Sequence, residues 1–187
     1  LAVGSVCGSF AAPVCLDALD RIEQTLALGN GWNWTSLAVK ADDMSIPYIM
    51  EGVASETCLV KSKTHSVMYY NNLWDGASIT LNNREMYKVL MASAQQLTVT
   101  GARPSQAEKA ITVRPGWNWI AYNETSIADL GDAFAGLTPE DGDLVKGKQG
   151  FAIYDGYEWS GSLQALMPGQ GYMYLSKAAQ ARAFNYP

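Results

Sequence analysis

Aromatic and amide side chains at predicted loop tips are the residues whose chemistry points to ligand binding. Trp and Tyr stack on the apolar face of a sugar ring, and Asn forms hydrogen bonds with sugar hydroxyls. Six Trp and ten Tyr are many for a chain of 187 residues. The candidate ligand-binding residues are Trp74, Trp159, Tyr70, Asn71, Asn72 and Tyr157.

The other four Trp favour a different interpretation. They form two pairs, each spaced two residues apart in a predicted strand, so each pair shares one face of its strand. We expect these four to be structural core residues: Trp32, Trp34, Trp117 and Trp119. Trp74 and Trp159 lie just before a glycine near a predicted hairpin, where both partial exposure and burial are compatible with the pattern.

Known catalytic and metal-binding patterns are missing from the sequence. The single His65 excludes a multi-His metal site, and three Cys exclude a Cys₄ zinc site. No Gly-x-Ser-x-Gly motif and no phosphate-binding glycine loop occurs. One acidic cluster lacks the calcium-loop spacing and is interpreted as a helix face and a turn: Asp129, Asp132, Asp141 and Asp143. We predict a protein that is not an enzyme and has no cofactor and no metal.

Charge and cysteine usage narrow the partners and the compartment. A net charge of −5 argues against binding to a nucleic-acid backbone, and no apolar run reaches the roughly 18 residues that a membrane span needs. Cys7 and Cys15 enclose a short loop, which predicts either a disulfide in an oxidising compartment or two buried thiols. Cys58 lies in an apolar stretch and is expected to be a buried free thiol.

An internal repeat at an offset of 85 residues organises the chain. Gly31-Trp32-Asn33-Trp34 recurs as Gly116-Trp117-Asn118-Trp119, and residues 26–102 share 16 identities with residues 111–187. All six Trp fall on three repeat positions. Such self-similarity predicts duplication of one folded unit.

Period-two alternation and turn signals predict the fold class. We expect a mainly β protein with two tandem homologous modules, each a small antiparallel β-sandwich or barrel with one short helix. Residues 26–102 form the first repeat and residues 103–187 the second. Residues 1–25 are expected to be a lead-in, with the last strand of a preceding module and the Cys7/Cys15 loop. We therefore expect the natural protein to continue beyond one or both ends.

Two segments are predicted to be the helices. In the second repeat, Ile127, Leu130, Phe134 and Leu137 share one helical face, and Ser126 and Asp129 match a capping box. In the first repeat, residues 45–50 allow a shorter helix, because the proline within them is tolerated in a first turn.

The second repeat resembles a known family of tandem modules. The resemblance rests on the motifs Gly116-Trp117-Asn118-Trp119, Pro168-Gly169-x-Gly171-Tyr172-Met173-Tyr174 and the closing Phe184-x-Tyr186-Pro187. They are similar to the GWNW/PGxGYMY repeats of large secreted or surface-anchored bacterial proteins. The first repeat departs from the pattern, since Asn83-Arg84 replaces Pro168-Gly169. The resemblance implies a modular protein, outside the cell or on the bacterial surface, and brings no catalytic residue with it.

Two functions are compatible with these observations. The first is a non-catalytic binding or adhesion module of a secreted bacterial protein, with glycan as the favoured ligand class; duplication of a weak site raises avidity. The alternative is a structural spacer or protein–protein interaction module that positions neighbouring domains in the same chain. The expected partner is a glycan or another surface protein, with no nucleic acid and no membrane insertion. Exposed aromatic rings favour the first function, and six buried Trp favour the second.

Overall fold

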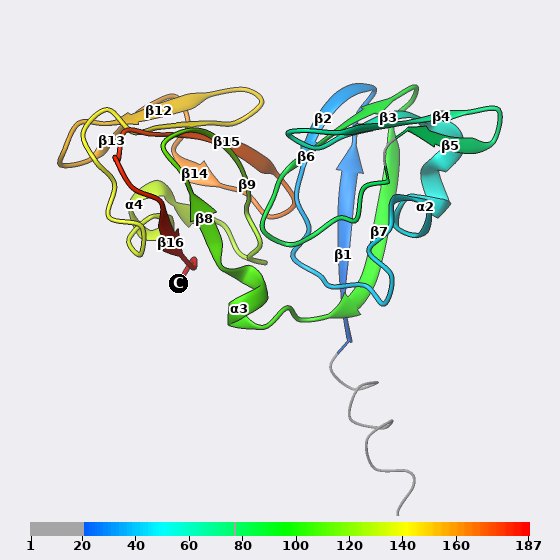
Figure 1. The fold of residues 1–187 in the computed structure, drawn as a ribbon, viewed down its shortest axis with the longest axis horizontal. Coiled ribbons are helices and arrows are strands. Elements are labelled where there is room, and N and C mark those ends of the chain that lie inside the picture. The colour runs from blue at the N-terminus through cyan, green and yellow to red at the C-terminus, as the bar shows by residue number, and fades with distance from the viewer. Residues whose placement is uncertain (1–20, 77) are drawn as a thin grey trace, which may run out of the picture.

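Two β-rich modules lie side by side in the structure, a computed structural model that describes residues 21–76 and 78–187 (Figure 1). Its strands pair antiparallel throughout, which confirms the predicted mainly β class. Helix α3 (Gln106–Lys109) lies in the connector between the modules.

The first module is a five-stranded sheet packed on a two-stranded layer. The sheet has the order β2-β6-β3-β4-β5, and β1 pairs with β7 beneath it. Leu26, Leu28 and Val99 from the lower layer pack with Val60 and Val89 from the sheet in one core. The elements are β1 (Arg21–Leu28), β2 (Gly31–Thr35), α2 (Ile46–Ile49), the 3₁₀ helix η1 (Glu51–Glu56), β3 (Thr57–Lys61), β4 (Ser66–Tyr70), β5 (Leu73–Gly76), β6 (Tyr87–Met91) and β7 (Gln95–Ala102).

The second module has its own core and the same sheet order, β9-β15-β11-β12-β13. Pairs in the two sheets correspond at the offset of 85: Gly31 pairs with Met91, and Gly116 with Ser176. The lower layer is β8 paired with β16. The elements are β8 (Ile111–Val113), β9 (Gly116–Ala121), β10 (Ala128–Asp129), α4 (Leu130–Ala133), β11 (Leu144–Lys146), β12 (Phe151–Tyr154), β13 (Trp159–Gly161), β14 (Ala165–Leu166), β15 (Gly171–Ser176) and β16 (Arg182–Phe184).

The boundary expected at residue 26 is wrong. Strand β1 begins at Arg21 and pairs with β7 along all eight residues, from Arg21 opposite Ala102 to Leu28 opposite Gln95. Residues 21–25 therefore belong to the first module, because a continuous ladder places them in its lower layer. Cys7 and Cys15 lie outside the described residues, as does the side chain of Cys58.

The helices are shorter than the sequence pattern predicts. Helix α2 carries a proline in its first turn, as expected. Helix α4 begins only after Asp129, whose side chain makes no capping bond, and Ile127 is exposed. Residues 128–129 pair with β14 instead, so the strand ladder takes the place of a first helical turn. A capping box does form in the connector, between Ser105 and Glu108.

A tight turn closes the outer hairpin of the first module. Asn71 and Asn72 adopt φ angles of 50° and 61°, the conformation of a two-residue hairpin turn. The corresponding turn of the second module is longer, because Asp155 accepts hydrogen bonds from the N–H groups of Tyr157 and Glu158. Within the described residues, no helix has the length and apolar character of a membrane span.

Candidate ligand-binding surface

A buried asparagine sets the direction of each Trp pair. Asn33 in β2 and Asn118 in β9 point into the module, where each is only 7% exposed. The Asn118 side-chain amide accepts a bond from the Arg114 N–H at 2.9 Å and donates to the carbonyls of Arg114 at 2.7 Å and Gly116 at 2.8 Å. Asn33 makes the same bonds around Gly29 and Gly31. Because neighbours on a strand face opposite sides, the flanking Trp must point outward.

Replacing Asn118 with alanine is expected to lower the free energy of unfolding by about 2 kcal/mol, since it leaves buried backbone groups without partners. Urea unfolding followed by circular dichroism measures the change. Asn30→Ala is the matched control, because Asn30 is exposed, and its expected effect is within about 0.5 kcal/mol. Equal effects of the two substitutions would contradict this role of the buried amide.

The expected core placement of the four paired Trp is wrong. Trp32 is 41% exposed and Trp117 is 42% exposed, while Trp34 and Trp119 are half-buried. All four lie on the outer faces, which we define as the faces of the two five-stranded sheets turned away from their cores. The spacing of two residues is as predicted, but the asparagine between each pair takes the inward position.

Trp74 and Trp159 take the inward positions instead. Trp74 packs against the first core and lies 5.0 Å from Tyr69 between ring centroids. Trp159 packs against the second core, 5.3 Å from the buried Phe134 and 5.4 Å from Tyr154. Trp74 and Trp159 are therefore half-buried, each with one side packed on its core.

Rows of apolar side chains cross both outer faces from the exposed Trp. In the first sheet, the row follows the ladder from Trp32 to Leu90, Leu59 and Met68. In the second sheet, the corresponding row runs from Trp117 to Leu175, Leu144 and Ile153. Met68 and Ile153 are exposed, and the leucines are half-buried. Each outer face therefore has apolar side chains that reach solvent at both ends of its row, Trp32 and Met68 in the first sheet and Trp117 and Ile153 in the second.

The two modules meet at a junction with an approximate twofold arrangement. The Ser36 N–H donates to the Gly169 carbonyl at 3.0 Å, and the Ala121 N–H donates to the Arg84 carbonyl at 3.1 Å. Adding 85 to Ser36 gives Ala121, and adding 85 to Arg84 gives Gly169, so the two contacts exchange the roles of the modules. This is the reciprocal pattern of a twofold dimer interface, built within one chain. The Ser36 hydroxyl bonds the carbonyls of Tyr122 and Gln170 as well.

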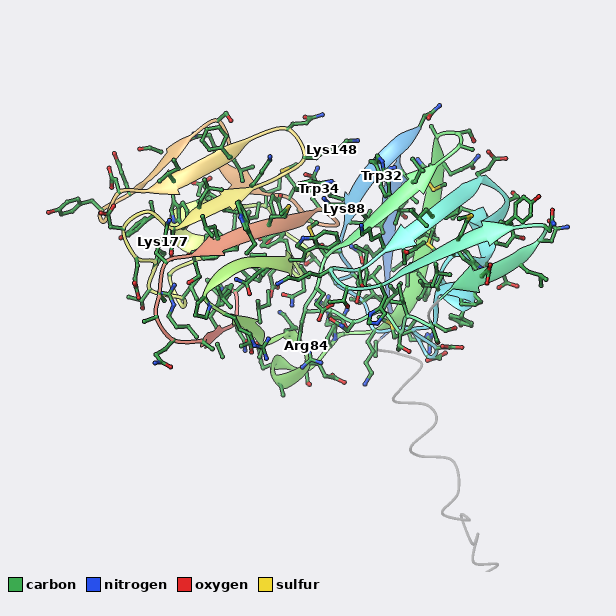
Figure 2. All side chains as sticks on the ribbon, turned by 45° about the horizontal axis from the view of Figure 1, so that its top comes forward. Trp32, Trp34, Arg84, Lys88, Lys148 and Lys177 are labelled. Carbon is green, nitrogen blue, oxygen red and sulfur yellow. The ribbon has the colours of Figure 1, made fainter. Side chains whose placement is uncertain are left out.

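Lys88 lies at the centre of the junction between one Trp of each module. Its Nζ is 4.3 Å from the ring centroid of Trp34 and 4.7 Å from that of Trp119, within cation–π distance of both. Burial lowers the pKa of Lys88, and the charges of Lys61 and Lys146 lower it further. Figure 2 shows Trp34 and Lys88 where the two modules face each other, with Lys148 beside them.

A groove opens on each side of this centre. The larger, of about 820 Å³, is lined by residues that include Trp34, Lys148 and Gln149. The smaller, of about 300 Å³, is lined by residues that include Lys63 and Trp119. Trp34 corresponds to Trp119 and Lys63 to Lys148 at the offset of 85, so the grooves are related by the same approximate symmetry. Each groove combines a Trp from one module with a Lys from the other.

The remaining sequence candidates lie far from the junction. Tyr70, which is 67% exposed, and the Asn71-Asn72 turn lie beside β5, at the outer edge of the first sheet. Tyr157, which is 93% exposed, lies beside β13 at the outer edge of the second sheet. They are solvent-facing as predicted, but the structure does not bring them together, since β5 and β13 lie at opposite ends of the molecule (Figure 1).

One cleft of the second module does contain two of the candidates. Trp159 and Tyr157 line a cleft of about 600 Å³ together with Tyr154, Glu158 and Gln164. The Trp159 ring forms part of its wall while also packing against Phe134. The cleft belongs to one module, whereas the junction combines both.

The acidic cluster divides into surface and structural residues. Asp129, Asp132 and Asp141 are exposed, as expected for a helix end and a turn. Asp143 is fully buried and binds the Tyr174 hydroxyl and Arg182. No group of three or more His, Cys, Asp or Glu with metal-binding geometry occurs in the described part of the chain. His65 is exposed in the β3–β4 turn, next to the Thr64 hydroxyl.

Sequence reasoning missed Lys88 and the role of the four outward Trp. The signal available for Trp34 and Trp119 was their repetition, which a core position would also show. Lys88 corresponds to Met173 in the second repeat, so nothing in the repeat pattern distinguished it. Comparisons of the chain with protein-family models, curated proteins and solved structures find no match.

Proposed function

We propose that this chain is a binding module without catalytic activity and that its ligand class is glycan. The observation that carries the proposal is the outward direction of four Trp on the joined outer faces. A flat indole ring fits the apolar face of a sugar, and rings spaced along a sheet provide successive stacking positions. Location outside the cell or on the bacterial surface follows from the family resemblance and is part of the proposal.

The junction strengthens this proposal because it fixes the two modules relative to each other. Separate sites on a flexible tether gain affinity only through effective concentration. Here Lys88 contacts Trp34 and Trp119 at once, and the backbone bonds of Ser36 and Ala121 hold the sheets together. The two Trp rows therefore form one preorganised surface, which lowers the ordering cost of binding.

A protein–protein interaction module is the second candidate. It is favoured by the aliphatic residues within the rows, because Leu59, Met68 and Ile153 provide apolar contact without the flat ring that a sugar prefers. The two candidates differ in what the Trp contribute. For a glycan, single Trp rings dominate affinity, whereas a protein interface would depend on Met68 and Ile153 as well.

Replacing both Trp32 and Trp117 with alanine is expected to weaken glycan binding by about a hundredfold, roughly tenfold for each ring. These two Trp are the most exposed of the four, so the double variant should remain folded. A glycan array followed by affinity electrophoresis on the bound glycans measures the loss.

The matched control is the double variant Tyr70→Ala and Tyr157→Ala, which removes exposed rings at the outer edges. Its affinity should stay within twofold of the parent chain. If the double Tyr variant lost binding and the double Trp variant kept it, the binding site would lie at the outer edges of the sheets. No binding to any glycan on the array would remove glycan as the ligand class, and turnover of a glycoside or peptide substrate would overturn the non-catalytic assignment.

A further inference from the structure

Lysines gather on the joined outer faces, among the Trp rows. Lys61 pairs with Lys88 across β3 and β6, and Lys146 lies on β11, the strand that corresponds to β3 in the second sheet. Lys63 and Lys148 follow these strands in the turns beside the junction. Figure 2 shows Lys148 and Lys88 at the meeting line of the modules.

These five lysines have no carboxylate partner among the described residues. The basic residues that form salt bridges within the described part of the chain are Arg21, Lys40, Lys109 and Arg182. Lys63 instead reaches across the junction and donates to the Trp117 carbonyl at 2.7 Å. Burial is the main cause of the lowered pKa of Lys88, and the nearby charges of Lys61 and Lys146 lower it further. A cluster of like charges that the fold leaves unneutralised attracts an anion.

The clustering contrasts with the charge of the whole chain. The protein has a net charge of −5 and only 13 Lys and Arg, and five of these lie on this surface. The lining of the smaller groove contains Arg84, Arg114 and Glu85, but Figure 2 shows Arg84 apart from Lys88 and Lys148. Asp75, on β5, lies at the outer edge of the first sheet, four strands away from β2. The centre of the surface is therefore positive within an acidic molecule.

We infer that the ligand is an acidic polysaccharide, a sugar chain that carries carboxylate or sulfate groups, bound across the junction. This inference rests on the proposed glycan function and specifies the ligand within it. Sugar rings stack on the outward Trp, and their anionic groups bind the five lysines. The approximate twofold symmetry places Lys61 and Lys63 on one side of Lys88 and Lys146 and Lys148 on the other, so one extended chain contacts both modules. A nucleic acid is disfavoured, because its denser uniform charge meets the acidic remainder of the molecule.

Affinity electrophoresis or calorimetry with chemically matched polymers tests the inference. Polygalacturonate is compared with its methyl-esterified form, and dextran sulfate with dextran. Poly-L-glutamate is an anionic control that has carboxylates but no sugar rings to stack on the Trp. An oligo-dT strand is an anionic control that has no sugar carboxylates. We expect at least tenfold tighter binding to the acidic member of at least one glycan pair, and a loss of that preference as salt screens the lysines.

Substitution of the lysines provides the second arm of the test. The double variant Lys61→Gln and Lys146→Gln should lose at least tenfold in affinity for the acidic polymer. The control is Lys177→Gln, because Lys177 is exposed on the second module away from Lys88 and Lys148 (Figure 2). Lys177→Gln alone should change affinity for the acidic polymer less than twofold. Adding Lys148→Gln to this variant should weaken that affinity clearly.

The outcomes separate this inference from the proposed function. Equal binding to acidic and neutral polymers, with dependence on Trp32 and Trp117, would overturn the acidic ligand while supporting glycan binding. Binding to poly-L-glutamate or oligo-dT as tight as to the acidic glycans, without dependence on the Trp, would overturn both. Binding to no polymer of the panel and to no glycan on an array would also overturn both.

Discussion

Replacing Asp143 with alanine is expected to lower the free energy of unfolding of the second module by about 3–5 kcal/mol, the cost of removing one partner from a buried ionic network. The carboxylate is fully buried. It accepts hydrogen bonds from the Tyr174 hydroxyl at 2.6 Å, the Lys177 N–H at 2.6 Å, the Glu140 N–H at 3.0 Å and the Arg182 guanidinium at 3.0 Å. Alanine leaves all four donors without this acceptor.

The pH dependence of stability follows from the same network. Burial by itself raises the pKa of Asp143, but the hydrogen bonds from Lys177, Tyr174, Glu140 and Arg182 outweigh it, and the net pKa is lowered. A carboxyl group with a lower pKa in the folded state stabilises the fold fully above its unfolded pKa, near 4. This contribution is lost as the pH falls below about 4 and passes through the folded pKa.

Urea unfolding of the parent chain and the variant at several pH values between 7 and 2 tests both statements. Hydrogen exchange assigns the loss to the second module. Asp141→Ala is the matched control, because Asp141 is exposed two residues away, and we expect a change within about 0.5 kcal/mol. An Asp143 variant that retains the parent's stability at pH 7, or its acid dependence, would contradict this role for the network.

Replacing Gly171 with alanine is expected to open the junction. A Cβ at this position would lie 2.3 Å from the Cβ of Met86 and 2.8 Å from the backbone oxygen of Thr35, both in the first module. Neither atom is the end of a flexible side chain, so the modules must separate. Overpacking of this kind costs about 1–3 kcal/mol, and separation would move Lys88 away from Trp119.

Small-angle scattering, hydrogen exchange at Thr35 and Ser36 and affinity for the glycan together measure this effect. We expect a larger radius of gyration, faster exchange and at least tenfold weaker binding, with both modules still folded. Gly131→Ala is the control, because a Cβ at Gly131 meets no atom within 4 Å. If Gly171→Ala binds with unchanged affinity while the junction opens, the ligand does not need both modules, and the junction is not the site.

The sequence pattern predicted the fold class well, because strands and turns depend on residues that are close together in the chain. Alternation of apolar residues and turn signals predicted the mainly antiparallel β class, and the Asn71-Asn72 segment forms a tight hairpin turn. The helix predicted from Ser126 is shortened to residues 130–133, since residues 128–129 pair with β14, whose residues lie 36 and 38 positions further along the chain. Sequence separation of this kind leaves no trace in a local periodicity.

The candidate site was predicted less well, and the reason lies in two asparagines. The two-residue spacing of Trp32 and Trp34 predicts that they share one face of the strand. It does not predict which face, because shifting the strand by one residue moves every side chain to the opposite face. An apolar pair would ordinarily take the core. Here the amides of Asn33 and Asn118 satisfy the turn backbone from within, and the Trp turn outward.

The amino-acid order was sufficient to find the residues that recur at an offset of 85, the antiparallel β class and the three Trp positions, because these depend on local period and self-similarity. The exposure of Trp32 and Trp117, the inward packing of Trp74 and Trp159 and the placement of Lys88 between Trp34 and Trp119 arise from folding in three dimensions. Each of these depends on which segments distant in the chain pack together. The junction is the clearest case, since Lys88 brings together Trp34 and Trp119, which the repeat identifies as equivalent positions but not as neighbours.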